Sequence, residues 1–338
     1  MITPIRSYTV SSIKDIEMMP FLERAQFTLN GRMSPNKRQT TVALSRMNLG
    51  STEIFIHYDF LRTVPRFMMM NEGCRQMMVD EIADLIVYSQ RCSNLKGIVI
   101  HMDNCFKAEF VKEYKSLYEG GKLISDSIKK LMVKHIVSPM YVKPEEAFEL
   151  SMKINTGNED VVSFLVNWYI RSFFMFDSYL RIALERRCFN PASNHCKVYL
   201  ENTTHILKEE TELNRPGSFY FNVDLIKSTS KDLFGVCYDT EHGWASKDHV
   251  EKNSLITASK AVPLMVHLNT IEKGVKYGNY RDLHSKTTVF ECTENQPEYY
   301  YDLVSIFTQE SIPYVREVKS DTMYRELEQQ NKFISNLK

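Results

Sequence analysis

GVCYDTEHGWASKDH, residues 235–249, is a short apolar run that ends in polar residues. Asp239 closes the run, and His242 follows three residues later, where glycine and tryptophan break the pattern. A carboxylate and an imidazole at the mouth of a buried strand are costly to desolvate unless a partner receives them. The candidate partners are a metal ion, a substrate or an ordinary buried hydrogen bond.

The same kind of run recurs along the whole chain. Eight apolar or β-branched runs occur, at residues 6–11, 25–29, 53–58, 96–102, 197–202, 234–240, 263–269 and 312–318. Spacers such as residues 74–90 carry apolar residues at helical intervals. Strands that alternate with one-sided helices are typical of a parallel sheet, and eight repeats predict a (β/α)8 TIM barrel.

One spacer is far longer than the others. About a hundred residues separate the fourth run from the fifth, although a single connecting helix needs only a fraction of that length. We therefore expect a single barrel domain over residues 1–338, with a long helical insertion between strands 4 and 5 inside residues 108–195.

A polar residue closes, or nearly closes, six of the eight runs. In a barrel the carboxyl ends of all strands meet on one face, and that face carries the active site. The sequence therefore predicts one cluster from six separate positions: His57, His101, Glu201, Asp239, His267 and Glu317.

Each position also has an ordinary structural reading. A histidine at the end of a buried run is often only a hydrogen-bonded structural residue. Glu201 suits a helix cap, Asp239 a turn, and Glu317 an ion pair with Arg316 or Lys319. Together, however, three carboxylates buried around one axis repel one another strongly unless a cation lies among them. Mixed imidazole and carboxylate donors favour zinc, manganese or iron over calcium.

Three further donors extend this set. His242 accompanies Asp239, and the segment RDLH places Asp282 and His284 two residues apart on an extended loop. Nine nitrogen and oxygen donors are too many for one tetrahedral ion, so they indicate two or three ions.

These residues carry a resemblance to a known family. The segments LENTTH, GVCYDTEHGWA, MVHLNTIEKGVKYGNYRDLH and IPYVREV resemble successive segments of the endonuclease IV family of abasic-site (AP) endonucleases. Members of that family are zinc-dependent (β/α)8 barrels of the xylose isomerase-like superfamily. The resemblance is strongest in the last third of the chain and weak through most of the remainder outside the insertion.

The resemblance implies up to three divalent ions, namely zinc, with manganese or iron as alternatives at some sites. The implied ligands are His57, His101 and Glu201 for the first ion, Glu201, Asp239, His267 and Glu317 for the second, and His242, Asp282 and His284 for the third. It implies hydrolysis on the 5′ side of an abasic site in double-stranded DNA, which leaves a 3′-hydroxyl and a 5′ deoxyribose phosphate. Glu201 or Glu317 would orient the nucleophile.

The resemblance also implies contacts with DNA. Arg32, in FTLNGR, matches the arginine that enters the DNA at the lesion, and Phe60 replaces a tyrosine that fills the gap left by the flipped nucleotide. Arg62, Arg66 and Lys107 are further candidate contacts with the phosphate backbone.

The chain departs from the family pattern at three places. HMDNCFK follows the fourth strand without a second histidine, TTHILKE replaces a glycine-rich tail, and RSYTVSS lacks the first-strand histidine. These departures leave the shape of the DNA groove and the substrate preference open.

Two alternatives therefore remain beside the nuclease. A sugar isomerase or epimerase needs only Glu201, Asp239, His267 and Glu317 around one or two ions, so the additional histidines favour phosphodiester chemistry. A catalytically silent DNA-binding barrel has no physical need for nine metal donors.

Composition limits the partners and the cellular compartment that we expect for the protein. Lysine plus arginine equals aspartate plus glutamate at 42 each, so a nucleic-acid partner needs a local patch rather than an overall positive field. The seven cysteines form no CxxC pair, which favours a reducing compartment. MITPIRSYTV lacks a signal-peptide core, and the apolar residues 161–176 include Asn167 and Arg171. We expect a soluble intracellular monomer, in the cytoplasm or with viral or nuclear DNA, and no membrane partner.

Overall fold

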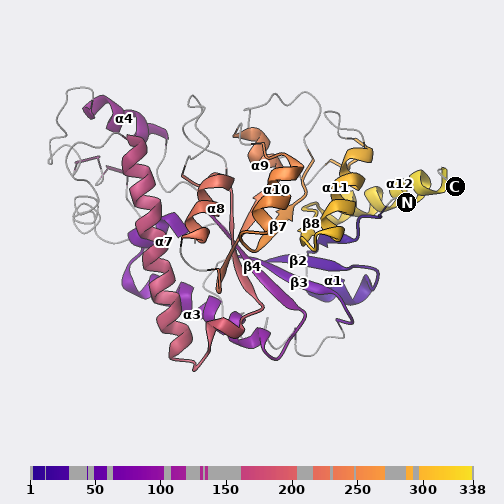
Figure 1. The fold of residues 1–338 in the computed structure, drawn as a ribbon, viewed down its shortest axis with the longest axis horizontal. Coiled ribbons are helices and arrows are strands. Elements are labelled where there is room, and N and C mark those ends of the chain that lie inside the picture. The colour runs from indigo at the N-terminus through magenta and orange to yellow at the C-terminus, as the bar shows by residue number, and fades with distance from the viewer. Residues whose placement is uncertain are drawn as a thin grey trace.

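The eight predicted strands form one parallel sheet in sequential order, β1 to β8 (Figure 1). The computed structural model describes residues 3–11, 13–29, 44, 49–58, 64–102, 108–118, 130–131, 134–135, 161–203, 216–228, 231–246, 249–270, 287–291 and 297–336. Its strands are β1 (Ser7–Thr9), β2 (Arg24–Leu29), β3 (Glu53–Tyr58), β4 (Leu95–His101), β5 (Lys197–Glu201), β6 (Phe234–Asp239), β7 (Leu264–His267) and β8 (Tyr314–Val315). Each predicted run overlaps one strand. Strands β2 and β4 begin one residue earlier than predicted, and β1, β7 and β8 are clearly shorter than predicted.

Among the described residues, helices lie between successive strands except between β2 and β3, and they pack around the sheet (Figure 1). They are α1 (Ile13–Met18), η1 (Val64–Met69), α3 (Glu72–Ser89), α4 (Ala108–Tyr118), α7 (Val161–Glu185), η2 (Pro191–Ser193), α8 (Phe219–Lys227), α9 (Thr240–Ala245), α10 (Lys252–Ser259), α11 (Pro297–Gln309) and α12 (Ser320–Asn336), where η marks a 3-10 helix. Side chains cap several of these helices. Asn71 Oδ1 accepts from the Cys74 amide at the start of α3, at 2.9 Å.

The sheet closes on itself between its first and last strands. Tyr8 and Arg316 form a parallel bridge. Two 2.9 Å hydrogen bonds support it, from the Thr9 amide to the Arg316 carbonyl and from the Arg316 amide to the Ser7 carbonyl. Because closure leaves no unpaired edge, every strand has two neighbours. The prediction of a (β/α)8 TIM barrel is therefore confirmed.

Both faces of the barrel strands are buried, which explains why the strands read as continuous apolar runs. On one face, residues such as Ile98 and Ile100 pack into the large core between barrel and helices. On the other face, six side chains form a separate cluster, which we call the barrel floor: Phe55, Val99, Tyr199, Cys237, Met265 and Val315. Each floor residue lies two positions before one of the predicted strand-end polar residues. Since strand side chains alternate in direction, the polar residues point to the same side of the sheet as the floor.

Tyr199 has the largest side chain of the floor, and two glycines make room for its ring. A Cβ atom at Gly97 would lie 2.6 Å from Tyr199 Cε2 and 2.9 Å from Phe55 Cδ1. A Cβ atom at Gly235 would lie 2.8 Å from Tyr199 Cε1 and 2.6 Å from the Pro263 carbonyl oxygen. Both glycines are therefore required by close packing inside the barrel.

The long segment between β4 and β5 ends in a helix that covers the barrel. Trp168 Nε1 and Ser172 Oγ of α7 both donate to the Pro65 carbonyl, at 2.9 and 3.1 Å. Phe173 and Phe176 of the same helix contact the Phe234 ring of β6. The helix α7 thus takes the place of the connecting helix between β4 and β5, and the additional length of this segment precedes it. Although α7 has 25 residues, no helix in the described ranges is long and apolar enough to cross a membrane.

A buried ion pair fixes the last helix to the barrel. Arg316 and Glu326 are both fully buried, and their nearest charged atoms lie 3.2 Å apart. The Arg316 guanidinium also donates to Thr270 Oγ1 and to the Thr287 carbonyl. These two threonines flank residues 271–286, so Arg316 holds both ends of the segment that carries Asp282 and His284. Glu326 in turn accepts from the Tyr8 hydroxyl, which ties β1 to α12.

The packing around Tyr199 gives a test of the barrel interior. We expect Gly97→Ala to lower the free energy of unfolding by about 1–3 kcal/mol, because the added methyl overpacks the floor. Gly73→Ala is the matched control, because its Cβ would meet only Asn71 Oδ1 at 3.5 Å and α3 favours alanine. Urea denaturation measures both variants. Equal stability of Gly97→Ala and the wild type would contradict this packing.

Candidate metal centre

The six strand-end residues lie together at the carboxyl end of the barrel, one layer above the floor. The strand register pairs His101 with Glu201 and Asp239 with His267. Glu201, Asp239 and His267 are at most 1% exposed, and the Glu317 side chain is 14% exposed. The parallel barrel therefore brings together side chains from the ends of five strands, β3 to β7, and one side chain that follows β8.

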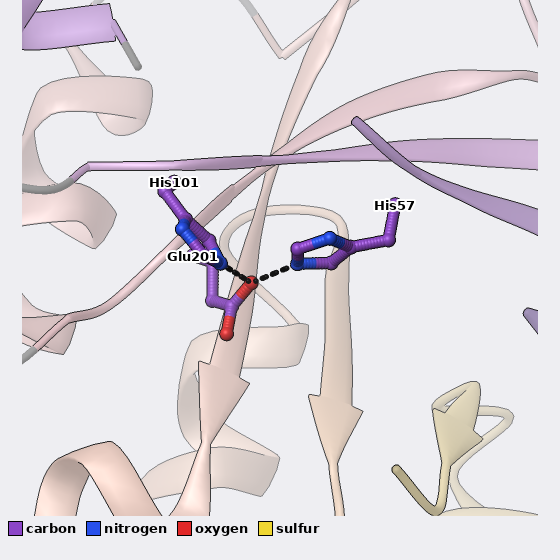
Figure 2. Close-up of side chains that lie close together, drawn as sticks. All are labelled: His57, His101 and Glu201. Atoms are coloured by element: carbon purple, nitrogen blue, oxygen red, sulfur yellow. Dashed lines mark hydrogen bonds and ion pairs between the residues drawn. The ribbon is translucent and has the colours of Figure 1, made fainter. Parts of the chain in front are cut away.

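One oxygen of Glu201 receives two imidazoles. His57 Nε2 lies 3.1 Å from Glu201 Oε2, and His101 Nε2 lies 3.2 Å from the same atom. Figure 2 shows the two rings approaching this oxygen from either side. Their centroids are 4.7 Å apart. Two ring nitrogens and one carboxylate oxygen thus converge on a common point.

The other oxygen of Glu201 faces a second pair of imidazoles. His242 Nδ1 and His267 Nδ1 each lie 3.3 Å from Glu201 Oε1. The carboxylate of Glu201 therefore lies between two groups of histidines, one on each oxygen. Glu201 thus belongs to more than one group of potential ligand atoms.

Gln26 fixes the orientation of His267. Its Nε2 donates to Glu317 Oε1 at 2.7 Å, and its Oε1 lies 3.0 Å from His267 Nε2. Because the amide oxygen can only accept, His267 Nε2 carries a proton. Nδ1 then faces three carboxylates, at 3.3 Å from Glu201, 3.3 Å from Glu317 and 3.8 Å from Asp239. A neutral ring with a lone pair at Nδ1 would be repelled there, so this position requires either a second proton or a metal ion.

Asparagines hold the carboxylates in place. Asn269 Nδ2 donates to Asp239 Oδ2 at 2.6 Å and to Glu317 Oε2 at 3.3 Å, and its Oδ1 accepts from the Glu317 amide at 3.2 Å. Asn202 accepts from the Asp239 amide at 2.6 Å and donates to the Asp239 carbonyl at 3.2 Å. These amides orient donors that would otherwise repel one another.

Asp239 uses its two oxygens for different purposes. Oδ1 accepts from the His242 amide at 2.8 Å and caps α9, whereas Oδ2 faces His267 and Asn269. The turn-forming role considered for Asp239 is therefore present together with its place in the cluster. The ring of His242 lies 2.9 Å from the Asn202 carbonyl through Nδ1, so Nδ1 carries the proton and Nε2 has the lone pair in the neutral form.

Two of the ordinary readings of the glutamates do not hold. Arg316 pairs with Glu326 rather than with Glu317. Glu201 is 1% exposed among imidazoles and caps none of the described helices.

The charges of the cluster depend strongly on one another. Burial opposes ionisation of Glu201, but His101 and His267 outweigh it and hold the pKa of that carboxyl well below its usual range. Burial likewise disfavours the charged form of His242, but Asp239 and Glu201 raise its pKa to about 10. The pKa of His267 is raised well above its ordinary value, because Cys237, Glu317 and Glu201 more than offset its burial. In the metal-free protein, histidine protons thus supply the positive charge of the centre.

The residues present can hold metal ions. Ligand atoms lie within 4.8 Å of one another in two sets that share Glu201: His57, His101 and Glu201, and Glu201, Asp239, His267 and Glu317. Glu201 Oε1 and His267 Nδ1 are buried and lack hydrogen-bond partners within the described ranges. A shared cation would satisfy both atoms, and imidazole with carboxylate is a donor set typical of zinc.

The remaining predicted site residues fall elsewhere. Asp282, His284, Arg32 and Phe60 lie outside the described residues, as do the two candidate phosphate contacts Arg62 and Lys107. Arg66 lies on η1, and its Nε is buried without a hydrogen-bond partner among the described residues. Their roles stay predictions.

Three residues that orient the cluster were not predicted from the sequence. Gln26 is a polar residue in the middle of a buried strand, and the alternation of β2 would have placed it inside the barrel. Asn202 and Asn269 each follow a predicted ligand by one or two residues. Their positions were visible, but their partners are set only by the strand register.

Comparison with known proteins finds only distant structural similarity. The sequence matches no protein-family model and no curated protein. Among solved structures, the chain is similar to one described as a D-tagatose 3-epimerase-like protein, with 16% identity and a TM-score of 0.49 over 97% of this chain and 99% of that one. It is also similar to a xylose isomerase domain protein from Planctomyces limnophilus, with 8% identity and a TM-score of 0.48 over 98% and 96% of the two chains. The fold assignment rests on the strand order and the closure of the barrel.

The raised pKa of His242 predicts how the metal-free protein responds to pH. The folded state holds this proton up to about pH 10, whereas the unfolded state releases it near 6.5. The stabilisation is therefore complete below about pH 6.5, and we expect the free energy of unfolding to fall as pH rises from there to about 10. Urea denaturation after chelation measures it.

The control for this experiment is a histidine outside the centre. His242→Gln should make the dependence on pH shallower without removing it, because the pKa of His267 is raised as well. His195→Gln should retain it, because His195 precedes β5 at the opposite end of the barrel and burial lowers its pKa. A metal-free protein that gains stability between pH 6.5 and 10 would contradict the charge assignment.

Proposed function

We propose that this chain is a metal-dependent phosphodiesterase that hydrolyses the phosphodiester bond on the 5′ side of abasic sites in double-stranded DNA. The observation that carries the proposal is the position of Glu201, whose two oxygens face different groups of imidazoles. Centres with two or more ions clamp both the attacking and the leaving oxygen of a phosphate. The resemblance of the strand-end segments to the endonuclease IV family supplies the substrate.

The donors divide naturally between ions. His57 and His101 would hold one ion, and Glu201 would bridge it to a second ion held by three further residues, Asp239, His267 and Glu317. By the resemblance, His242 would hold a third with Asp282 and His284. Zinc is the proposed metal. Bound ions of this kind lower the pKa of water and neutralise negative charge on phosphate.

Glu317 is the carboxylate best placed to assist the nucleophile. Its side chain is 14% exposed, whereas those of Glu201 and Asp239 are 1% exposed or less. Gln26 and Asn269 hold its two oxygens, so its orientation is set before substrate arrives. Glu317 would orient the attacking water and accept its proton while a new P–O bond forms. The bond between phosphorus and the 3′ oxygen then breaks, and that oxygen takes a proton from solvent to become the 3′-hydroxyl.

DNA would be bound by a local patch, because the chain has equal numbers of basic and acidic residues. Arg32 and Phe60 would contact the lesion, as the resemblance implies. Arg66, with its unpartnered Nε on η1, is the described residue we propose for contact with the backbone. The protein would act as an intracellular monomer.

A sugar isomerase or epimerase is the second candidate. The set of Glu201, Asp239, His267 and Glu317 can hold one ion without any contribution from His57 or His101. Such an enzyme would interconvert sugars without hydrolysing phosphodiesters, so direct assays separate the two candidates.

The first test is incision of DNA. We expect a duplex with a single abasic site to be cut on the 5′ side when zinc or manganese is present, and to stay intact after chelation. Glu317→Gln should lower kcat/KM by more than about a hundredfold. Loss of a residue that only orients a metal ligand already lowers activity by about 10- to 100-fold, and Glu317 would act on the nucleophile itself. Glu53→Gln, on the same barrel but at the opposite end of β3, is the matched control. Absence of incision with every divalent metal would refute the proposal.

The second test counts the ions. His57→Asn should lower the number of tightly bound metals by one per chain and abolish incision, because the bridging arrangement loses one ion. Elemental analysis after gel filtration measures this. Sugar interconversion that survives His57→Asn and His101→Asn, with no incision by the wild type, would favour the isomerase.

A further inference from the structure

Cys237 lies directly beneath the metal centre. It is the fourth residue of β6, fully buried, and belongs to the barrel floor two residues before Asp239. The strand register places it beside Glu201 on β5 and Met265 on β7. Its thiol therefore shares a layer with hydrocarbon and aromatic side chains and borders the polar layer above.

The thiol is close enough to share an ion with two of the proposed ligands. The ligand atoms of Cys237, Glu201 and His267 all lie within 4.8 Å of one another. Two ligands of one zinc ion are separated by no more than the sum of their bond lengths, about 4.4 Å for sulfur and nitrogen. Small side-chain rotations thus bring all three atoms to one ion.

Two buried polar groups of the neighbouring strands lie beside this thiol, and one of them, His267, interacts with it directly. Glu201 Oε1 and His267 Nδ1 are two of the buried atoms without a well-oriented hydrogen bond within the described ranges, and their residues are 1% exposed or less. Gln26 occupies the other nitrogen of His267, so Nδ1 is the one directed to the centre. A cysteine that merely fills a core does not require two buried polar atoms beside it.

We propose that Cys237 is a thiolate ligand of the ion held by Glu201 and His267, which rests on the metal centre of the proposed function. On binding, the S–H proton leaves to solvent and a sulfur–metal bond replaces it. A thiolate is a soft donor, so this position favours zinc over manganese or magnesium.

Spectroscopy of the full chain tests this ligand without relying on activity. The metal-free protein is loaded with cobalt(II), and a thiolate-to-cobalt charge-transfer band in the near ultraviolet is expected. Cys237→Ala should lose this band while retaining the visible cobalt bands, and Cys196→Ala should retain both. Cys196 is the matched control because it is equally buried and lies before β5, outside the centre.

Two further measurements keep the inference falsifiable if Cys237→Ala folds poorly. X-ray absorption of the zinc-loaded wild type should show sulfur at about 2.3 Å. Cys237→Ser, which preserves size, should lower zinc affinity at least about tenfold and leave manganese affinity nearly unchanged, whereas a packing defect would weaken both metals.

The outcomes separate this inference from the proposed function. Bound cobalt without a charge-transfer band, or a band that persists in Cys237→Ala, overturns the assignment of Cys237 and leaves the metal centre intact. A wild type that binds no metal overturns both. A charge-transfer band without incision of abasic DNA supports the Cys237 ligand and counts against the nuclease alone.

Discussion

The structure of the site depends on one electrostatic constraint: three carboxylates, two of them fully buried, surround His267 at the mouth of the barrel. Glu201, Asp239 and Glu317 lie 3.3–3.8 Å from its Nδ1. Such a group of negative charges is stable only with positive charge among them, supplied by histidine protons or by metal ions. Gln26 decides which nitrogen of His267 faces the acids, because its amide oxygen accepts the proton of the other. The centre is thus preorganised for a cation.

The barrel makes this concentration of charge possible. Its interior has an apolar floor and a polar layer above it, and the two differ by one step of the strand alternation. Gly97 and Gly235 let Tyr199 fill the floor, which supports the strand-end polar residues from below. Outside the barrel, α7 and the buried pair of Arg316 and Glu326 hold the strands in place. Side chains on strands move less than side chains on loops, so the barrel fixes the distances between the strand-end polar residues.

Much of this arrangement could be predicted from the sequence, for an identifiable reason. Buried parallel strands are continuous apolar runs, so each of the eight could be located before its partners were known. A polar residue at the end of such a run is conspicuous, and barrel geometry places all such ends on one face. Gln26, Asn202 and Asn269 were missed because amides are common near strands and their function lies only in their partners. The position of α7 as a connecting helix likewise followed from contacts with Pro65 and Phe234 rather than from periodicity.

The sequence by itself determined the barrel, its strand order and the identity of the strand-end donors, because alternation and burial leave a periodic trace in the chain. Only the tertiary structure decided how those donors share their atoms. Glu201 divides its two oxygens between two groups of imidazoles, Asp239 divides its own between a helix cap and the cluster, and Cys237 meets Glu201 through the register of β5 and β6. These pairings join residues far apart in the chain. Their distances follow from closure and register, which no local pattern encodes.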